Sequence, residues 1–206
     1  MDKGPKWTNE VLRCAVDLPG DLMEIGVFRG ATLRLMLKAR AATAKARASH
    51  TFAFAQSVWA VDSWQGMAKP GPHDDKSYPK GKFGHVTFEA FLDEMNRHGW
   101  PACSFTPLKG FVPQVLQGIP AEAQLSFVHI DLDQFQPTVD AASWAWKHLN
   151  PGGVLAFHDW YPAKAILAAA GISQFMHNVM ASSLCPIRCA VEADEFIMYK
   201  PTTWEG

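Results

Sequence analysis

The sequence predicts an α/β fold of the doubly wound type, with a mostly parallel seven-stranded sheet that ends in an antiparallel C-terminal hairpin. The first observation behind this prediction is that short apolar runs, typical of buried strands, alternate with stretches of helical periodicity. The second is that strand–helix units follow one another before two strand-like pieces with a short connection. The third is composition: 48% hydrophobic and 19% charged residues are typical of a globular chain, and 206 residues suit a single domain over 1–206.

The expected elements alternate along the whole chain. Strands are expected at 22–27, 57–61, 103–108, 125–130, 154–157, 186–191 and 195–199. Helices are expected at 9–16, 30–47, 112–117, 137–149 and 163–180, and a further one after Thr87, which can cap it. Residues 150–153, Asn-Pro-Gly-Gly, are expected to stop a helix sharply, and Gly171 to interrupt or bend one.

Residues 63–84 are expected to form a lid loop over a ligand site. The segment is rich in Gly, Pro, Lys and aromatic residues and follows neither the helical nor the strand period. Long loops without secondary structure are uncommon in compact domains and usually functional. His73, Asp74 and Asp75 within it are expected to be solvated rather than to contact a ligand.

Charge and hydropathy narrow the range of partners. The net charge is -1 and the basic residues are scattered, whereas a nucleic-acid surface needs a concentrated basic field. No run approaches the roughly twenty apolar residues of a membrane span, and residues 1–9 lack an apolar signal core. We therefore expect a cytoplasmic protein with a small-molecule partner, reduced and mostly buried cysteines, and no contact with nucleic acid or membrane; a homodimer is an assembly that the sequence allows.

The turn Glu24-Ile-Gly26-Val-Phe28-Arg-Gly30 follows the first strand, where a doubly wound fold builds its first nucleotide site. A dinucleotide fingerprint needs glycine at position 28, and this chain has phenylalanine there. Phe28 therefore argues against NAD or FAD and favours S-adenosylmethionine, which has no phosphate. Asp62, at the end of the second strand, could accept hydrogen bonds from the ribose hydroxyls. The alternative is that Gly26 and Gly30 only shape the turn and Asp62 caps a helix.

Carboxylate and imidazole groups gather at two neighbouring strand ends, in the segments His129-Ile-Asp131-Leu-Asp133 and His158-Asp159. An oxygen-rich set with one imidazole suits Mg²⁺, Mn²⁺ or Fe²⁺. We expect Asp131 and Asp159 to hold the metal, with His158 or Asp133 as a further ligand or as the base that deprotonates a hydroxyl. Alternatively, Asp131 contacts substrate or cofactor without a metal and Asp133 caps the next segment. His129, inside an apolar strand, is expected to be a hydrogen-bonded core residue.

These pieces together resemble the macrocin-type (TylF/MycF) family of O-methyltransferases, which modify sugar hydroxyls of macrolide antibiotics. The resemblance rests on the segments 24–30 (EIGVFRG), 61–66 (VDSWQG), 109–111 (KGF), 129–138 (HIDLDQFQPT) and 151–160 (PGGVLAFHDW). They occur in the expected order between about residues 22 and 160. One departure is His158, because the family usually has paired aspartates where this chain has His158-Asp159.

The resemblance implies a class I methyltransferase fold, S-adenosylmethionine as cofactor and Mg²⁺ held at Asp131 and Asp159. It places cofactor contacts at Glu24, Gly26, Phe28, Arg29, Gly30, Asp62, Ser63, Gly110, Phe111 and Asp131. The expected metal ligands are Asp131, His158 and Asp159, and the expected catalytic residues are Asp131 and His158.

The function expected is therefore S-adenosylmethionine-dependent methyl transfer to a hydroxyl of a small molecule, such as a natural-product sugar or a phenol, assisted by a divalent metal. One alternative is a metal enzyme similar to the cephalosporin hydroxylases, with His158 as an iron ligand. Another is a non-catalytic cofactor-binding protein. The clustered carboxylates disfavour the last alternative, because grouped charges are costly unless something binds them.

Overall fold

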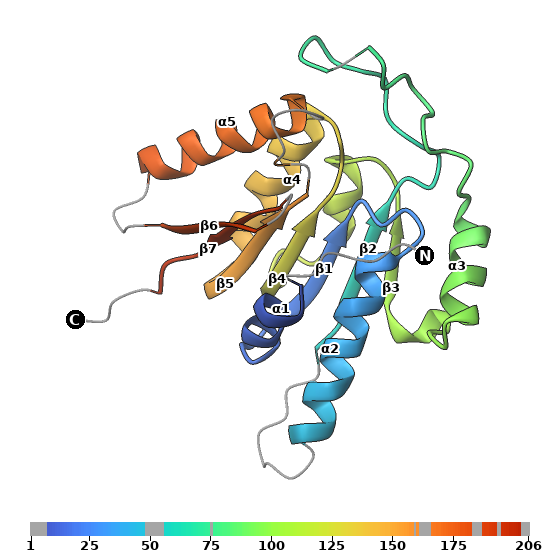
Figure 1. The fold of residues 1–206 in the computed structure, drawn as a ribbon, viewed down its shortest axis with the longest axis vertical. Helices are drawn as coiled ribbons and strands as arrows, with labels where there is room; N and C mark the ends of the chain where they lie inside the picture. Colours follow the sequence, from blue (N-terminus) through green and yellow to red (C-terminus); the bar gives the residue numbers. More distant parts are fainter. Residues whose placement is uncertain are drawn as a thin grey trace.

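The computed structural model describes residues 8–47, 56–74, 76–158, 160, 166–182, 187–192 and 195–202. Its centre is one sheet (Figure 1). The strands are β1 (Asp21–Ile25), β2 (Val58–Asp62), β3 (Thr106–Lys109), β4 (Leu125–Ile130), β5 (Leu149–Phe157), β6 (Arg188–Glu192) and β7 (Glu195–Tyr199). They lie in the order β3-β2-β1-β4-β5-β7-β6. The predicted seven-stranded doubly wound sheet is confirmed.

Strand pairing is parallel from β3 through β5 and antiparallel in the C-terminal hairpin. β1 pairs with β2 on one side and with β4 on the other, so the order of the strands reverses beside β1. β7 runs antiparallel to both β5 and β6, which confirms the predicted hairpin. In a doubly wound sheet, ligands bind where the strand order reverses, beyond the carboxyl ends of the strands.

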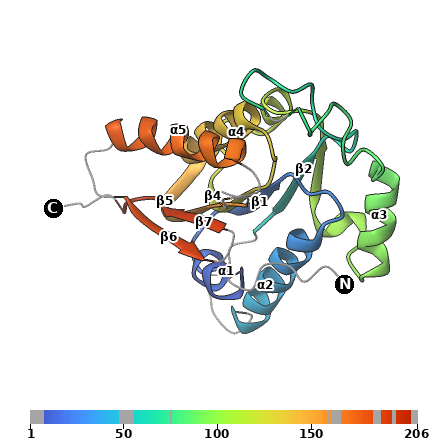
Figure 2. The same cartoon turned by 45° about the horizontal axis from the view of Figure 1, so that its top comes forward.

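Helices cover both faces of the sheet (Figures 1 and 2). The α-helices are α1 (Thr8–Val16), α2 (Ala31–Arg47), α3 (Phe88–Arg97), α4 (Phe135–His148) and α5 (Ile166–Ser182), and the short 3₁₀ helices are η1 (Ala102–Ser104) and η2 (Gln114–Gly118). α1, α2 and α3 supply residues to one hydrophobic cluster, whereas α4, α5 and η2 supply residues to a second cluster on the other face. α3 begins as predicted, because the Thr87 hydroxyl accepts a hydrogen bond from the Ala90 N–H.

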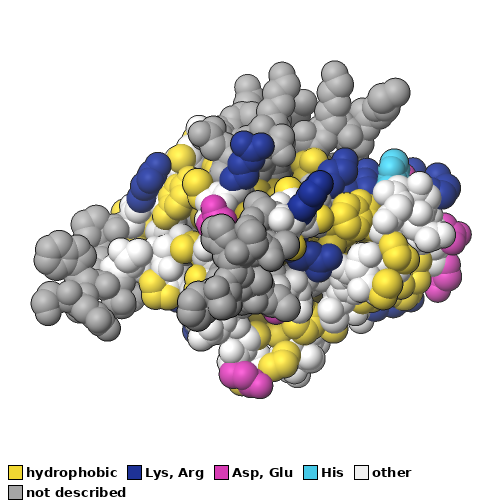
Figure 3. All heavy atoms as spheres, turned by 90° about the horizontal axis from the view of Figure 1, so that it is seen from below, with side chains coloured by type: hydrophobic (Ala, Val, Ile, Leu, Met, Phe, Trp, Pro, Cys, Tyr) yellow, Lys and Arg dark blue, Asp and Glu magenta, His cyan; other side chains and the backbone are white. Residues whose placement is uncertain are grey.

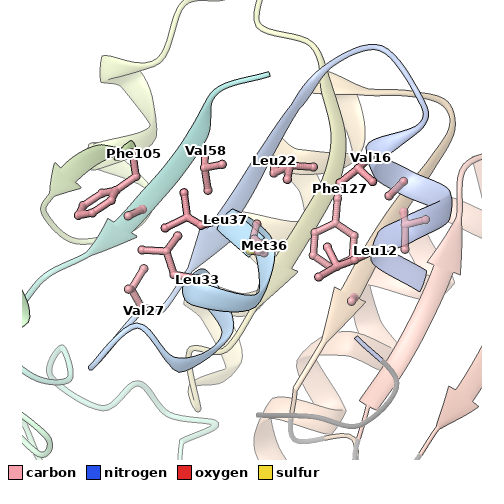
Figure 4. Packing of buried hydrophobic residues seen from close by; sticks show 14 of the residues in the cluster. Leu12, Val16, Leu22, Val27, Leu33, Met36, Leu37, Val58, Phe105 and Phe127 are labelled. Atoms are coloured by element: carbon pink, nitrogen blue, oxygen red, sulfur yellow. The ribbon is translucent and has the colours of Figure 1, made fainter. Parts of the chain in front are cut away.

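Alternating strand residues explain why two cores form. Leu22 and Phe127 pack with α1 and α2 in the cluster of Figure 4, whereas their neighbours Met23 and Val128 face α4 and α5. All four side chains are fully buried. A sheet that is buried on both faces requires nearly continuous apolar strands, so a polar residue in one of these strands needs a specific partner.

Three details of the fold differ from expectation. α4 ends at His148, just before residues 150–153 as expected, but these residues belong to β5, which begins at Leu149, because Leu149 pairs with Leu125 and the Gly152 N–H donates to the Lys200 carbonyl. α5 continues through Gly171 without interruption; a Cβ at Gly171 would lie 2.8 Å from the Phe135 carbonyl oxygen, so this glycine allows close packing of α5 against the start of α4. The cysteines that the structure describes are exposed rather than buried: Cys14, Cys103 and Cys189.

The outer surface is mixed in character. On the face shown in Figure 3, basic side chains stand among apolar, neutral and a few acidic ones. None of the helices in the described part of the chain combines the length and apolar character needed to cross a bilayer.

Candidate active site

A cavity of about 300 Å³ lies at the carboxyl ends of β1, β2, β4 and β5. Of the residues predicted to form the site, eight line it: Gly26, Phe28, Asp62, Ser63, Gly110, Phe111, Asp131 and His158. Glu24, Arg29 and Gly30 are not among the lining residues. Asp159 lies outside the described residues. Residues from five separate segments of the sequence therefore meet in one cavity, as the strand order requires.

Gly26 forms the floor of the turn after β1. Its φ is +91°, and a Cβ at this position would lie 1.8 Å from the carbonyl oxygen of Asp131. Glycine is therefore required both by the backbone conformation and by the close passage of the β4 end. The Gly26 N–H donates to the Val61 carbonyl at 2.8 Å. The turn is thus fixed against the ends of both neighbouring strands.

The Asp62 carboxylate holds the same turn from the β2 side. Its Oδ2 accepts hydrogen bonds from the backbone N–H groups of Val27 and Phe28, each at 2.8 Å, and its Oδ1 accepts the Trp64 N–H at 2.7 Å. A carboxylate has about four acceptor positions, so three backbone bonds leave room for roughly one ribose hydroxyl. The prediction that Asp62 binds ribose therefore stays open, and the sequence did not reveal its role in shaping the turn.

The remaining residues of the turn play different parts. Phe28 adopts a φ of +50° and lines the cavity, with its ring edge-on to Phe83 at 5.8 Å between centroids. Arg29 is exposed, and its guanidinium lies 5.5 Å from the Phe28 ring centroid. Gly30, at φ +78°, leaves space for Met95, whose sulfur would be 2.7 Å from an added Cβ. Gly30 thus serves helix packing.

Ser63, Gly110 and Phe111 complete the wall on the β2 and β3 side. The Ser63 hydroxyl donates to the Gly66 carbonyl at 2.8 Å, and the Gly110 N–H donates to the Asp62 carbonyl at 2.9 Å. These bonds are local to the wall. The Phe111 carbonyl accepts the Val115 N–H at 3.0 Å, so each of the three residues is fixed by a local hydrogen bond.

The loop over residues 63–84 contributes Trp64, Gly66, Met67, Ala68 and Phe83 to the cavity. Its two arms are joined by backbone hydrogen bonds from the Met67 N–H to the Lys82 carbonyl and from the Gly81 N–H to the Met67 carbonyl, both 2.9 Å. Backbone hydrogen bonds therefore hold the two ends of this loop together beside the cavity.

The loop also reaches α4 (Figure 2). Asp74 Oδ1 accepts the backbone N–H of Phe135, the first residue of α4, at 2.7 Å, and Gln134 Nε2 donates to the Ala68 carbonyl. The expectation that Asp74 is merely solvated is wrong, because it satisfies an N–H that the helix itself leaves unpaired.

Burial raises the pKa of Asp131 to about 7, His158 lowers it in part, and Asp133 raises it further. Asp131 and Asp133 both line the cavity. A carboxyl that changes charge near neutral pH is well suited to a proton transfer, or to a cation that replaces the proton. The electrostatics of the cavity therefore fit either of the roles expected for Asp131.

A buried polar row leads away from the cavity. His158 Nδ1 lies 2.6 Å from Glu195 Oε1; the other oxygen of Glu195 lies 3.6 Å from His129 Nε2, and His129 Nδ1 lies 3.4 Å from Glu24 Oε1. Burial alone would lower the pKa of His129, but Glu195 and Glu24 outweigh it and raise that pKa well above its usual range. Burial raises the pKa of Glu24, whereas the two histidines outweigh burial at Glu195 and lower its pKa.

His129, His158 and Glu195 each offer a ligand atom within 4.8 Å of the others, which is a possible metal group among the described residues. The acidic neighbours of His129 raise its pKa and so favour its protonated form, which has no lone pair for a metal. The same residues also belong to a buried polar row in which His129 lies between Glu24 and Glu195. Glu195 itself was missed by the sequence analysis.

Known proteins give an independent view of this site. The family model of a methyltransferase domain matches residues 23–160, which include the turn after β1 and the ends of β2, β4 and β5. A curated relative, the 8-demethyl-8-(2,3-dimethoxy-alpha-L-rhamnosyl)-tetracenomycin-C 4'-O-methyltransferase of Streptomyces olivaceus, is 28% identical over 153 residues. The match covers 69% of this chain and 54% of that protein, so the chain spans about half the length of this relative.

Solved structures resemble the fold over nearly the whole chain. The O-methyltransferase NovP is similar with a TM-score of 0.73 at 19% identity, covering 94% of this chain and 79% of that one. The calicheamicin methyltransferase CalS11 is similar with a TM-score of 0.64 at 18% identity, covering 97% and 77%. The O-methyltransferase TomG from Streptomyces achromogenes has a TM-score of 0.59 at 15% identity, covering 95% and 80%. At these identities the likeness concerns the fold.

Proposed function

This chain belongs to the methyltransferase-domain family whose model matches residues 23–160, and on that premise we propose that it transfers a methyl group from S-adenosylmethionine to a hydroxyl of a small molecule. The observation that carries the proposal is the single cavity shared by the turn at Gly26 and the polar pair Asp131 and His158. A nucleoside site and a proton-handling site are then adjacent, which methyl transfer to a hydroxyl requires.

The turn after β1 suits a cofactor without phosphate. A phosphate at such a turn is bound by free backbone N–H groups. Here the Val27 and Phe28 N–H groups are already donated to Asp62, and the Phe28 side chain occupies the place of a glycine. S-Adenosylmethionine supplies a nucleoside, an amino acid portion and an electrophilic methyl group on a sulfonium. We assign its binding to Gly26, Phe28, Asp62, Ser63, Gly110, Phe111 and Asp131.

The acceptor would lie on the other side of the cavity, under the loop. Met67, Phe83 and Leu132 give the cavity apolar surface, and Asp133 and Gln134 give it polar groups. Mixed walls of this kind suit a sugar or a phenol, which presents hydroxyls on an otherwise apolar body. The Streptomyces relative, named for a rhamnosyl tetracenomycin, supports a natural-product sugar as the first acceptor to test. The loop over residues 63–84 would act as the lid that excludes water from this reaction.

We assign proton transfer to ionisable residues that line the cavity. Asp131, with a pKa of about 7, and His158 are the groups able to accept the hydroxyl proton as the oxygen attacks the methyl carbon. A divalent cation held by Asp131 and Asp159, with His158 either as a further ligand or as the base, remains a prediction. When bound, such a cation would lower the pKa of the acceptor hydroxyl.

A mass-spectrometric screen tests the proposal. Wild-type protein and D131N are incubated with methyl-labelled S-adenosylmethionine and a panel of rhamnosylated aromatic compounds, nucleotide-linked rhamnose and simple phenols. We expect at least one acceptor to gain a single labelled methyl group with wild type and far less with D131N. If no acceptor gains the label and S-adenosylmethionine does not bind, the proposal is wrong; gain of oxygen by an acceptor in the presence of Fe²⁺ would instead favour a hydroxylase.

A further inference from the structure

Four ionisable side chains from four neighbouring strands form one continuous row that ends in the cavity. Glu24 of β1, His129 of β4 and Glu195 of β7 are 2%, 1% and 1% exposed, whereas the His158 side chain, which follows β5, is 36% exposed and lines the cavity. Acidic and imidazole groups alternate along the row. Its order from the interior to the cavity is Glu24, His129, Glu195, His158.

Strand register builds this row. Glu24 and His129 are direct partners in the pairing of β1 with β4. Phe157 and Phe196 are partners in the antiparallel pairing of β5 with β7, so His158 and Glu195 occupy the next pair of positions beyond them. The alternation of strand side chains directs all four to the face that α1 and α2 cover. The contact between His158 and Glu195 is therefore set by the pairing of β7 with β5.

Packing alone does not account for these residues. Burying several charges costs free energy, and apolar side chains of similar size at such positions often stabilise a fold as well or better. The row occupies the core of a sheet in which nearly every neighbour is apolar. Of the four residues in the row, only His158 lines the cavity. Glu195 is thus placed to orient the His158 imidazole.

We propose that Glu195, supported by His129 and Glu24, is a positioning residue that holds His158 with its proton on Nδ1 and its Nε2 lone pair toward the acceptor hydroxyl. The Glu195 carboxylate accepts the Nδ1–H, as the aspartate does for the histidine of a serine-protease triad. This inference rests on the proposed methyl transfer and adds the base and its orienting group. Neither Glu195 nor the hairpin that carries it lies within the matched residues 23–160.

In the proposed step, the His158 Nε2 lone pair takes the proton of the acceptor hydroxyl while the oxygen forms a bond to the transferred methyl carbon. The carbon–sulfur bond breaks, and its electron pair stays on sulfur, which becomes a neutral thioether. The imidazolium then returns its proton to water.

Nitrogen NMR of the full-length protein labelled with ¹⁵N-histidine tests the orientation directly. The His158 signals are identified by their loss in H158N. We expect wild-type His158 to be the tautomer with hydrogen on Nδ1, and E195Q to shift it toward hydrogen on Nε2, because the amide of glutamine can donate to Nδ1. With an acceptor found by the screen, E195Q should lower kcat by roughly 100-fold or more with little change in KM.

The matched control is E94Q on α3, which breaks the surface pairs of Glu94 with Arg97 and with His98, the residue that follows the helix. None of these residues lines the cavity. E94Q should leave the His158 tautomer and kcat unchanged. A wild-type His158 with hydrogen on Nε2, or E195Q with the wild-type tautomer and kcat, overturns the inference. Binding of S-adenosylhomocysteine, measured on the same samples, separates these outcomes from a failure of the proposed function.

Discussion

Asp62 Oδ2 accepts the backbone N–H of Phe28 at 2.8 Å, and this bond ties the turn after β1 to the end of β2. The same oxygen also accepts the Val27 N–H. The two N–H groups that could have bound a phosphate are thereby occupied, so one side chain shapes the turn and, under the proposed function, restricts the class of nucleotide that the turn would bind. Substitution of Asp62 tests this double role.

Replacing Asp62 with alanine should weaken both folding and cofactor binding. Three hydrogen bonds to a carboxylate are lost, and their backbone donors are left without that partner. We expect the free energy of unfolding to fall by about 2–4 kcal/mol in denaturant titrations, with a weaker affinity for S-adenosylhomocysteine by calorimetry. D140A, which removes only a helical pair between Gln136 and Asp140, should change both quantities little. Equal stability of D62A and wild type would contradict the role of the carboxylate.

Gly26 should not tolerate even alanine. An added Cβ would meet the Asp131 carbonyl oxygen at 1.8 Å, and the φ of +91° is strained for any L side chain. We expect G26A to destabilise the protein by about 3 kcal/mol or more in urea unfolding, or to prevent folding. G118A is the matched control, because nothing lies within 4 Å of a Cβ there, and it should retain wild-type stability. A fully stable G26A would show that the turn is not fixed against β4.

Removing the charge of Asp131 should stabilise the protein above neutral pH. The pKa of about 7 in the folded state lies above the unfolded value of about 3.9. The stability that protonation of Asp131 contributes is therefore complete below about pH 3.9 and is lost as the pH rises through 7. At pH 8, D131N should therefore unfold at a higher temperature than wild type, and its free energy of unfolding should be larger by about 1–3 kcal/mol. At pH 4 it should show no such gain.

The same comparison tests the expected metal. A divalent cation bound by Asp131 replaces the proton and stabilises the charged carboxylate, so Mg²⁺ should raise the stability of wild type at pH 8 and leave D131N unaffected. If none of Mg²⁺, Mn²⁺ and Fe²⁺ changes the stability of either protein, the metal site is wrong, whereas the proposed methyl transfer is unaffected.

Protonated His129 should stabilise the protein at low pH, and this contribution should be lost as the pH rises. Its folded-state pKa is raised well above the unfolded value of about 6.5, so its contribution is complete below pH 6.5 and is lost as the pH rises through the folded-state pKa. We expect wild type to be more stable than H129Q by about 3 kcal/mol or more at pH 6, since H129Q removes the positive charge that faces the buried carboxylates of Glu24 and Glu195. That advantage should shrink by about 1.4 kcal/mol per pH unit above 6.5. A constant difference from pH 6 to pH 9 would mean that His129 is neutral.

Much of the fold could be predicted because its signals are local. The apolar run over Leu125–Ile130 gave the bounds of β4, and the Thr87 hydroxyl was identified as a helix cap from its position before an amphipathic stretch. The turn at Gly26 could be placed because a strand and a helix flank it. Local patterns of this kind depend on residues within one or two turns of the chain.

The parts that could not be predicted depend on distant partners. Glu195 contacts His158 across 37 residues, and Asp74 caps α4 across 61, so each requires the strand order or the loop path to be known. Residues 150–153 resemble a turn in isolation, but pairing with β4 and with Lys200 places them in β5. A glutamate directly before the apolar stretch Phe196–Met198 was the one available signal for Glu195, because a carboxylate next to a buried strand needs a partner.

The most direct measurement is a calorimetric titration of dialysed wild-type protein with S-adenosylmethionine. A cavity that offers a phosphate-free nucleoside site predicts saturable binding at one site per chain, competition by S-adenosylhomocysteine and no competition by NAD. Absence of binding, or binding of NAD in its place, would contradict the assignment of this cavity to methyl transfer.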